Sequence, residues 1–352
     1  SKPVEFGEDG QKVITGIALM MATSMQDFSN LDGYYTQSFD GRSTAYRFIY
    51  EHTLTPSDSK LYSVWGNVYS TISRIKIFDS LLERSGVTEI PPFMAYIHQL
   101  AAVQYFQLAS WWENVPYVIS YDNSFAVTKQ LVSRDLFANL VEDLNYCVEH
   151  SKLEPGKFDS SESFLYPSQG ASLALLAKMY LHQKSYDQAY AHLKRIIDSG
   201  VYALELSSSA SLTRNSRELI WGLLTSAQPE SYENVLKEND YVPFVTYTEV
   251  LLSASECAYR LGNQGEAMDY LNRVRQARNL PPVSGAGFIE SLRSTWQSYF
   301  AFLRRNDLAT GQLKIESYQQ LLPIPQQEID YPDSKLIQNP GWGKKQEETA
   351  TF

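Results

Sequence analysis

The clearest candidates for binding chemistry are aromatic rings and charged side chains interspersed between Leu31 and Arg47. The four rings are those of Tyr34, Tyr35, Phe39 and Tyr46. The charged side chains among them are those of Asp32, Asp40 and Arg42. An aromatic face complements the apolar C–H face of a sugar ring, and carboxylate and guanidinium groups hydrogen-bond to hydroxyls. Because the stretch has no helical period, we expect these residues to bind a ligand rather than to cover helix ends.

Three tryptophans are further stacking candidates, and core packing is a competing interpretation for each of them. Trp111 and Trp112 are adjacent at the end of a predicted helix, so one of the pair must face away from the core. That ring would stack on a sugar, or the pair would form a wedge beneath the turn at 114–116; the usual burial of tryptophan favours the wedge. Trp221 ends a short candidate strand, where packing explains it equally well. Tyr232 is a weaker candidate in the segment that follows.

No arrangement of side chains in the sequence predicts catalysis. A hydrolase commonly needs two carboxylates across a cleft or a nucleophile with its base, and neither pattern is recognisable. The chain has no Gly-x-Ser-x-Gly elbow or glycine-rich phosphate loop, and its five histidines lack metal-ligand spacing. Cys147 and Cys257 fall in helical patterns and are expected to be buried free thiols. We therefore expect no catalytic residue, no metal and no cofactor.

Composition excludes several classes of protein. The 352 residues carry 40 acidic against 30 basic side chains, for a formal charge of -10, which disfavours binding to nucleic acid or to anionic lipid. No apolar run approaches the roughly 20 residues that cross a bilayer, and the polar start of the chain is not the apolar core of a signal peptide. The high tyrosine content, 24 residues, suits either helix packing or a sugar-binding surface.

The elements that must position the candidate residues are mostly helices, because apolar positions recur at three- and four-residue spacing along most of the chain. We expect one domain, 1–352, of mostly α structure. Its helical-hairpin core is predicted over residues 11–29, 61–112, 133–200 and 246–305. Irregular loops on the ligand side are predicted at 29–60 and 201–245, and a C-terminal tail at 310–352. Apolar residues between prolines indicate that this tail is strapped to the surface.

Two predicted hairpins share one internal template, with small residues where the helices cross. The matching positions are Ala177, Tyr180, Ala189 and Leu193 in the first, and Ser255, Ala258, Ala267 and Leu271 in the second. This pattern indicates tetratricopeptide-like packing. The match is partial, because the hairpins are not adjacent in the sequence and lack the full signature of the repeat.

Four stretches together point to one family. They are the hairpin and exit strand at 171–204, the Asn272-x-Val274-Arg275 motif, the tail motifs at 322–325 and 338–342, and Trp65, Tyr69 and Ile72 with the break at 114–116. In order and spacing the chain resembles the SusD/RagB-like nutrient-binding outer-membrane lipoproteins of the Bacteroidetes.

The chain also departs from that family. Of a helix motif usual in its members, only Arg304, Asp307 and Leu308 keep their places, whereas the glutamate positions are occupied by Arg293, Gln297 and Ala301. The segment between Trp221 and Tyr247, where many members insert ligand-contacting loops, is short.

The resemblance implies a function without catalysis. The protein would bind a nutrient at the cell surface, most simply an oligosaccharide, and deliver it to a SusC-type TonB-dependent outer-membrane transporter. It also implies ligand contacts in the first long loop and a lipidated cysteine at the mature N-terminus, which neither Cys147 nor Cys257 provides, so the anchor is expected upstream of Ser1. The alternatives are a tetratricopeptide-like scaffold that binds only protein and a glycoside hydrolase. The ligand class, glycan or peptide, stays open.

Overall fold

The computed structural model describes residues 8–84, 91–117, 126–151, 168–207, 216–224, 241–297 and 313–343. Helices dominate this part of the chain, as the apolar period predicts. The helices of the first half are α1 (Glu8–Tyr35), α2 (Arg47–Tyr50), α3 (Ser59–Arg84), α4 (Pro91–Trp112) and α5 (Ser133–Glu149). Those of the second half are α6 (Gln169–His182), α7 (Tyr186–Asp198), α10 (Tyr247–Arg260), α11 (Gln264–Ala277), α12 (Phe288–Gln297) and α14 (Gln326–Ile329), with a 3-10 turn η4 (Ser317–Gln320).

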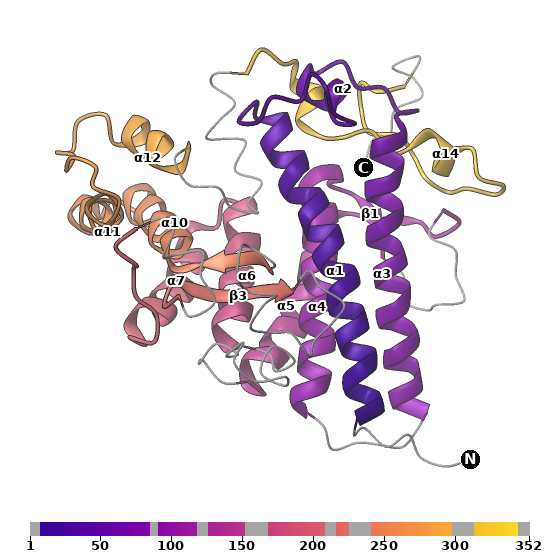
Figure 1. Ribbon diagram of the computed structural model, residues 1–352, viewed down its shortest axis with the longest axis horizontal. Coiled ribbons are helices and arrows are strands. Elements are labelled where there is room, and N and C mark those ends of the chain that lie inside the picture. The colour runs from indigo at the N-terminus through magenta and orange to yellow at the C-terminus, as the bar shows by residue number, and fades with distance from the viewer. Residues whose placement is uncertain are drawn as a thin grey trace.

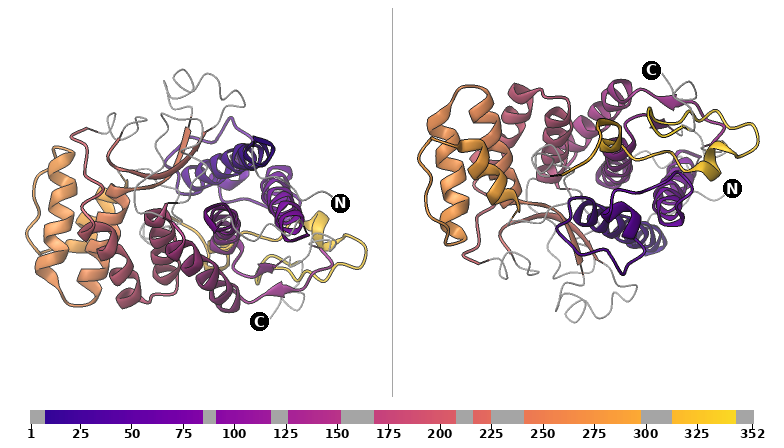
Figure 2. Two further views of the ribbon diagram at one scale, coloured as in Figure 1. Left: turned by 90° about the horizontal axis from the view of Figure 1, so that it is seen from below. Right: turned by 90° about the horizontal axis from the view of Figure 1, so that it is seen from above.

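The long helices form a row in which each packs against the next. Contacts run from α1 to α3, α4, α5, α6 and α7, then to α10, α11 and α12. Figure 1 shows this row, from α1 and α3 at one side of the molecule to α11 and α12 at the other. The views from below and above show that the C-terminal segment crosses the first half of the row (Figure 2).

The two predicted hairpins are confirmed as α6–α7 and α10–α11. Their small residues Ala177, Ala189, Ser255 and Ala267 are all buried at the helix crossings. The Ser255 hydroxyl donates to the carbonyl oxygen of Ala267 at 2.6 Å, which joins the second pair. Although far apart in the sequence, the hairpins are neighbours in space because α7 packs on α10.

The predicted first loop is wrong at its start, because α1 continues to Tyr35 instead of ending at residue 29. The turn-forming residues Asp32 and Gly33 obscure a helical period that Leu31 and Tyr35 prolong, and both of these apolar side chains are buried. The helix ends in a Schellman motif. Gln37 takes the left-handed position with φ 59°, and the Ser38 amide donates to the Gly33 carbonyl oxygen at 2.9 Å.

The segment 201–245, predicted as irregular, contains an antiparallel ribbon. Strand β3 (Leu219–Leu224) pairs with β4 (Tyr241–Thr246), with Leu224 opposite Tyr241 and Leu219 opposite Thr246, and the register is irregular on both sides of Trp221. Strand β4 was not predicted from the sequence because Pro243 lies inside it. A two-stranded ribbon tolerates proline, since each strand has an unpaired edge. A second short pair, β1 (Val115–Pro116) with β2 (Gln130–Leu131), follows α4.

The tail is confirmed as a strap over residues 313–343, which we call the strap. Its hydrogen bonds reach four distant segments: Gln326 N–H donates to the Pro56 carbonyl at 2.9 Å, Leu322 N–H to that of Trp111 at 2.8 Å, and Lys335 N–H to that of Ala126 at 2.7 Å. Ile337 N–H donates to the side chain of Gln130 at 2.7 Å.

The structure describes the Asn272-x-Val274-Arg275 motif and the beginning of the helix with the altered glutamate positions. Asn272 exchanges two hydrogen bonds with the backbone of Val283, at 2.9 and 3.1 Å, so this motif pins the chain that leaves α11. The helix that should carry the glutamate positions begins as α12 and includes Arg293 and Gln297. Ala301, Arg304, Asp307 and Leu308 lie outside the described residues, as does Tyr232.

None of the helices described here combines the length and apolar character needed to cross a bilayer.

Candidate functional site

Residues 32–58, comprising the last turn of α1 and the connection to α3, form what we call the aromatic loop. In it, the rings of Tyr34 and Tyr46 are stacked, with centroids 4.8 Å apart and planes at 20°. The Phe39 ring meets Tyr34 edge-on at 5.6 Å. Tyr46 is buried, Tyr34 is half-buried and Phe39 is 39% exposed. The three rings therefore form a ladder from the core to the surface, with Phe39 outermost.

A glycine allows the loop to fold closely onto these rings. A Cβ atom at Gly41 would lie 2.7 Å from the Cβ of Tyr50 and 3.0 Å from Cδ1 of Tyr34. These separations are shorter than carbon atoms tolerate without movement. The backbone at Gly41 thus passes between Tyr34 and Tyr50, which fixes the place of the neighbouring Asp40 and Arg42.

Asp40 and Arg42 form an exposed, two-pronged ion pair beside the rings. Arg42 Nη2 donates to Asp40 Oδ2 at 2.7 Å and Arg42 Nε donates to Asp40 Oδ1 at 2.9 Å. These hydrogen bonds lower the pKa of Asp40 to about 2 and raise the pKa of Arg42. The pair therefore stays charged at neutral pH and offers both donors and acceptors to a polar ligand.

Two of the four predicted rings face inward. The Tyr35 ring is buried, its hydroxyl donates to the carbonyl oxygen of Gln319 at 2.8 Å, and its edge contacts Trp111 at 5.5 Å. Tyr46 has the Lys60 ammonium 4.9 Å from its ring centroid, and burial raises the pKa of its hydroxyl. In the structure both rings pack in the interior, and their role in ligand binding stays a prediction from the sequence.

The expectation that one of Trp111 and Trp112 faces away from the core is wrong. Both side chains are at most 1% exposed. The strap covers the side that would otherwise meet solvent, and the Trp112 indole N–H donates to the carbonyl oxygen of Pro323 at 2.8 Å. The wedge interpretation therefore describes their placement.

Trp221 is also buried, with its ring edge-on to Phe244 of the neighbouring strand at 5.3 Å. Its surroundings are those of a packing residue.

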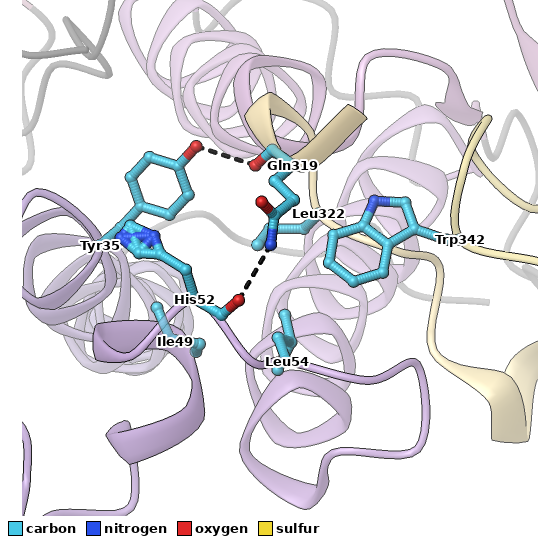
Figure 3. A pocket seen from close by; sticks show the side chains of 7 residues that line it. All are labelled: Tyr35, Ile49, His52, Leu54, Gln319, Leu322 and Trp342. Carbon is cyan, nitrogen blue, oxygen red and sulfur yellow. Dashed lines mark hydrogen bonds between the residues drawn. The ribbon is translucent and has the colours of Figure 1, made fainter. Parts of the chain in front are cut away.

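A small apolar hollow lies behind the aromatic loop, between α2 and the strap (Figure 3). It is lined by Tyr35, Ile49, His52, Leu54, Gln319, Leu322 and Trp342. Neither ring nitrogen of His52 has a hydrogen-bond partner among the described residues, and burial lowers the pKa of this imidazole. No local pattern in the sequence indicates the hollow, because its walls come from segments more than 260 residues apart.

One cluster has the residue types of a catalytic triad but a different arrangement. The Ser133 hydroxyl donates to Glu113 Oε1 at 2.6 Å, and Glu113 Oε2 lies 3.2 Å from His182 Nε2. A nucleophilic triad places histidine between serine and acid, so that it can accept the serine proton. Here the carboxylate lies between the other two. Ser133 is the first residue of α5, and Val132 is the N-cap residue.

The described residues hold no group of three His, Cys, Asp or Glu side chains arranged to bind a metal ion. Cys147 and Cys257 are confirmed as buried cysteines outside any disulfide, and burial raises the pKa of Cys147.

Comparisons with known proteins show the fold through solved structures. No protein-family model matches the chain, and no curated protein matches it. A SusD superfamily protein from Bacteroides thetaiotaomicron VPI-5482 is similar at a TM-score of 0.75 and 16% identity, covering 95% of this chain and 99% of that one. A laminarin-binding SusD-like protein is similar at a TM-score of 0.72 and 18% identity, with coverage of 95% and 99%.

A third structure is surface glycan-binding protein A from Bacteroides thetaiotaomicron in complex with laminarihexaose. Its TM-score is 0.71 at 16% identity, with coverage of 95% of this chain and 99% of that one. The chain therefore has the SusD-like fold over almost its whole length.

Proposed function

We propose that this protein binds an oligosaccharide at the cell surface without cleaving it, and passes the ligand to a SusC-type TonB-dependent outer-membrane transporter. The observation that carries the proposal is the exposed Phe39 ring, held edge-on by Tyr34 and set beside the Asp40–Arg42 pair. A sugar presents an apolar face and a rim of hydroxyls, and this surface offers a counterpart to each.

The comparisons support a glycan as the ligand class. One structure similar in fold is a laminarin-binding protein and another holds laminarihexaose. Because the identities are at most 18%, we use laminarihexaose as the first probe in a panel of glycans and peptides.

Binding without hydrolysis agrees with the charge state of the loop. A glycosidase needs a carboxylic acid that still carries its proton near neutral pH. The arginine beside Asp40 holds its pKa at about 2, so this carboxyl has no proton to give.

Transporter delivery and a lipid anchor at the outer membrane are supported by the resemblance in the sequence. Cys147 and Cys257 are buried within α5 and α10, so neither thiol is accessible to a lipid-transferring enzyme.

The packing of the two hairpins favours a second candidate, a tetratricopeptide-like scaffold that binds only protein. The two candidates differ in one simple respect: the scaffold would pass through a glycan-containing gel unretarded.

The test is affinity electrophoresis followed by calorimetric titration with laminarihexaose and the panel. We expect retention by at least one glycan, no hydrolysis products, and affinity reduced about fivefold to tenfold in Phe39→Ala. Tyr331→Ala is the matched control, because Tyr331 is an aromatic residue 50% exposed on the strap. Lack of retention by every glycan would contradict the proposal and favour the scaffold.

A further inference from the structure

One residue of the strap, Gln319, contacts both ends of the exposed part of the aromatic loop (Figure 3). Its carbonyl oxygen accepts a hydrogen bond from the Tyr35 hydroxyl at 2.8 Å, where α1 ends. Its side-chain Nε2 donates to the carbonyl oxygen of His52 at 2.9 Å, just beyond α2. Residues 36–51, which include Phe39, Asp40 and Arg42, are thus bracketed by two bonds to the same residue.

The side chain of Gln319 is itself held in place. Its Oε1 accepts a hydrogen bond from the Glu316 amide at 2.8 Å, which closes the start of η4. With the amide oxygen engaged there, the NH₂ group is directed at His52. A carboxamide carries an acceptor oxygen and a donor nitrogen on the same carbon, so one side chain can make both bonds.

The carbonyl that Gln319 holds lies at a reversal of the chain. His52 has a left-handed backbone with φ 57°, and the Thr53 amide donates back to the Phe48 carbonyl oxygen at 2.9 Å. This Schellman motif ends α2 and sets the direction in which the chain leaves the loop. A bond to the carbonyl of His52 therefore fixes a turn rather than a point within a helix.

Other contacts of residues 36–51 are made within the loop or to α1 and α3, where the buried Tyr46 stacks on Tyr34 and lies against Lys60. Gln37 Nε2 donates to the Tyr50 carbonyl oxygen at 2.8 Å, and the Asp40–Arg42 pair is local. Such contacts give the loop its shape, whereas the bonds to Gln319 set its position relative to the strap.

We propose that Gln319 is a positioning residue for the candidate binding surface: by holding Tyr35 and His52, it sets how the loop presents Phe39 and the Asp40–Arg42 pair. The inference rests on the proposed function for the ligand, but the clamp itself is testable without one.

The experiment compares Gln319→Glu with Gln320→Glu. The first variant keeps the acceptor for the Glu316 amide, removes the donor to His52, and places a carboxylate against a carbonyl oxygen. The control adds the same charge to the exposed neighbour in the same turn. Tyr35→Phe, a gentler variant, removes the hydrogen bond from the Tyr35 hydroxyl to the Gln319 carbonyl oxygen and keeps the bond to His52.

Two quantities are measured: hydrogen exchange of amides in residues 36–54 without ligand, and affinity for laminarihexaose or for the best-retained glycan of the panel. For Gln319→Glu we expect about threefold to tenfold faster exchange confined to this segment and a loss of affinity of similar size. Tyr35→Phe should show a smaller change of the same kind, and Gln320→Glu none.

Exchange equal to that of the Gln320→Glu control would overturn the clamp, whether or not any glycan binds. Faster exchange with full affinity would overturn the positioning role. Failure of the unaltered protein to bind any glycan would instead refute the proposed function and the ligand part of this inference, leaving the exchange result to judge the clamp.

Discussion

Two aromatic clusters lie near the end of α1, and they differ in how far they are exposed. The tryptophan cluster, Trp65, Trp111 and Trp112, is closed over by the strap, and its members are at most 1% exposed. In the ladder of Tyr34, Tyr46 and Phe39, the outermost ring, that of Phe39, is 39% exposed among the residues that the structure describes. Both clusters consist of aromatic residues, and a segment some 200 residues away in the sequence covers the tryptophans.

The largest effect is expected from Trp112→Ala. This change removes a fully buried ring that meets Trp65 edge-on at 5.2 Å and bonds to the strap. We expect the free energy of unfolding to fall by about 3–5 kcal/mol, measured by urea denaturation. Affinity of the folded fraction for its glycan should be unchanged. Weakened binding with unchanged stability would show that the tryptophan cluster, and not the ladder, serves ligand binding.

Gln338→Ala should have the next largest effect, because it removes hydrogen bonds within the strap and leaves the aromatic rings unchanged. The Gln338 side chain accepts from the amides of Ile324 and Asn339, at 2.7 and 2.9 Å, and donates to the carbonyl of Ile324 at 2.9 Å. Leaving these buried groups without partners should cost about 1–3 kcal/mol of unfolding free energy. Gln327→Ala, at an exposed position of α14, is the control and should cost nothing measurable.

The inner wall of the aromatic loop should respond to acid. Burial lowers the pKa of His52 from its ordinary 6.5, so the unfolded chain binds a proton more readily than the folded one. Stability therefore declines as the pH falls below about 6.5, until it passes the lowered pKa. His52→Asn, whose asparagine tolerates the left-handed backbone, should flatten this part of the profile. Melting temperatures are measured from pH 7.5 to 5 for both proteins. If the melting temperature depends on pH in the same way in the unaltered protein and in His52→Asn, His52 is not the group responsible.

The outer edge of the same loop should not respond. With the pKa of Asp40 at about 2, its carboxylate stays ionised from neutral pH to about pH 4. Glycan affinity over that range should therefore change less than about twofold on account of Asp40, whereas Asp40→Asn should weaken binding at every pH. The comparison is made by calorimetry on both proteins. A loss of affinity in acid that Asp40→Asn abolishes would overturn this prediction.

The sequence alone predicted what depends on local period. Apolar spacing predicted the mostly helical fold and both hairpins, and the proline-bounded apolar residues predicted the strap. The errors have local and distant causes. Asp32 and Gly33, between Leu31 and Tyr35, hid the end of α1, and Pro243 hid β4. Nothing near Trp112 in the sequence could reveal that the carbonyl oxygen of Pro323 accepts a hydrogen bond from its indole N–H. The ligand role of the predicted site residues stays a prediction.

Calorimetric titration of the best-retained glycan against Phe39→Ala, Tyr34→Ala and Trp112→Phe tests the central claim most directly. We predict affinity about fivefold to tenfold weaker in the first two, with the melting temperature of Phe39→Ala unchanged, and full affinity in Trp112→Phe. Unchanged affinity with lowered melting temperatures in both loop variants would contradict the account, because it would assign the aromatic loop to packing.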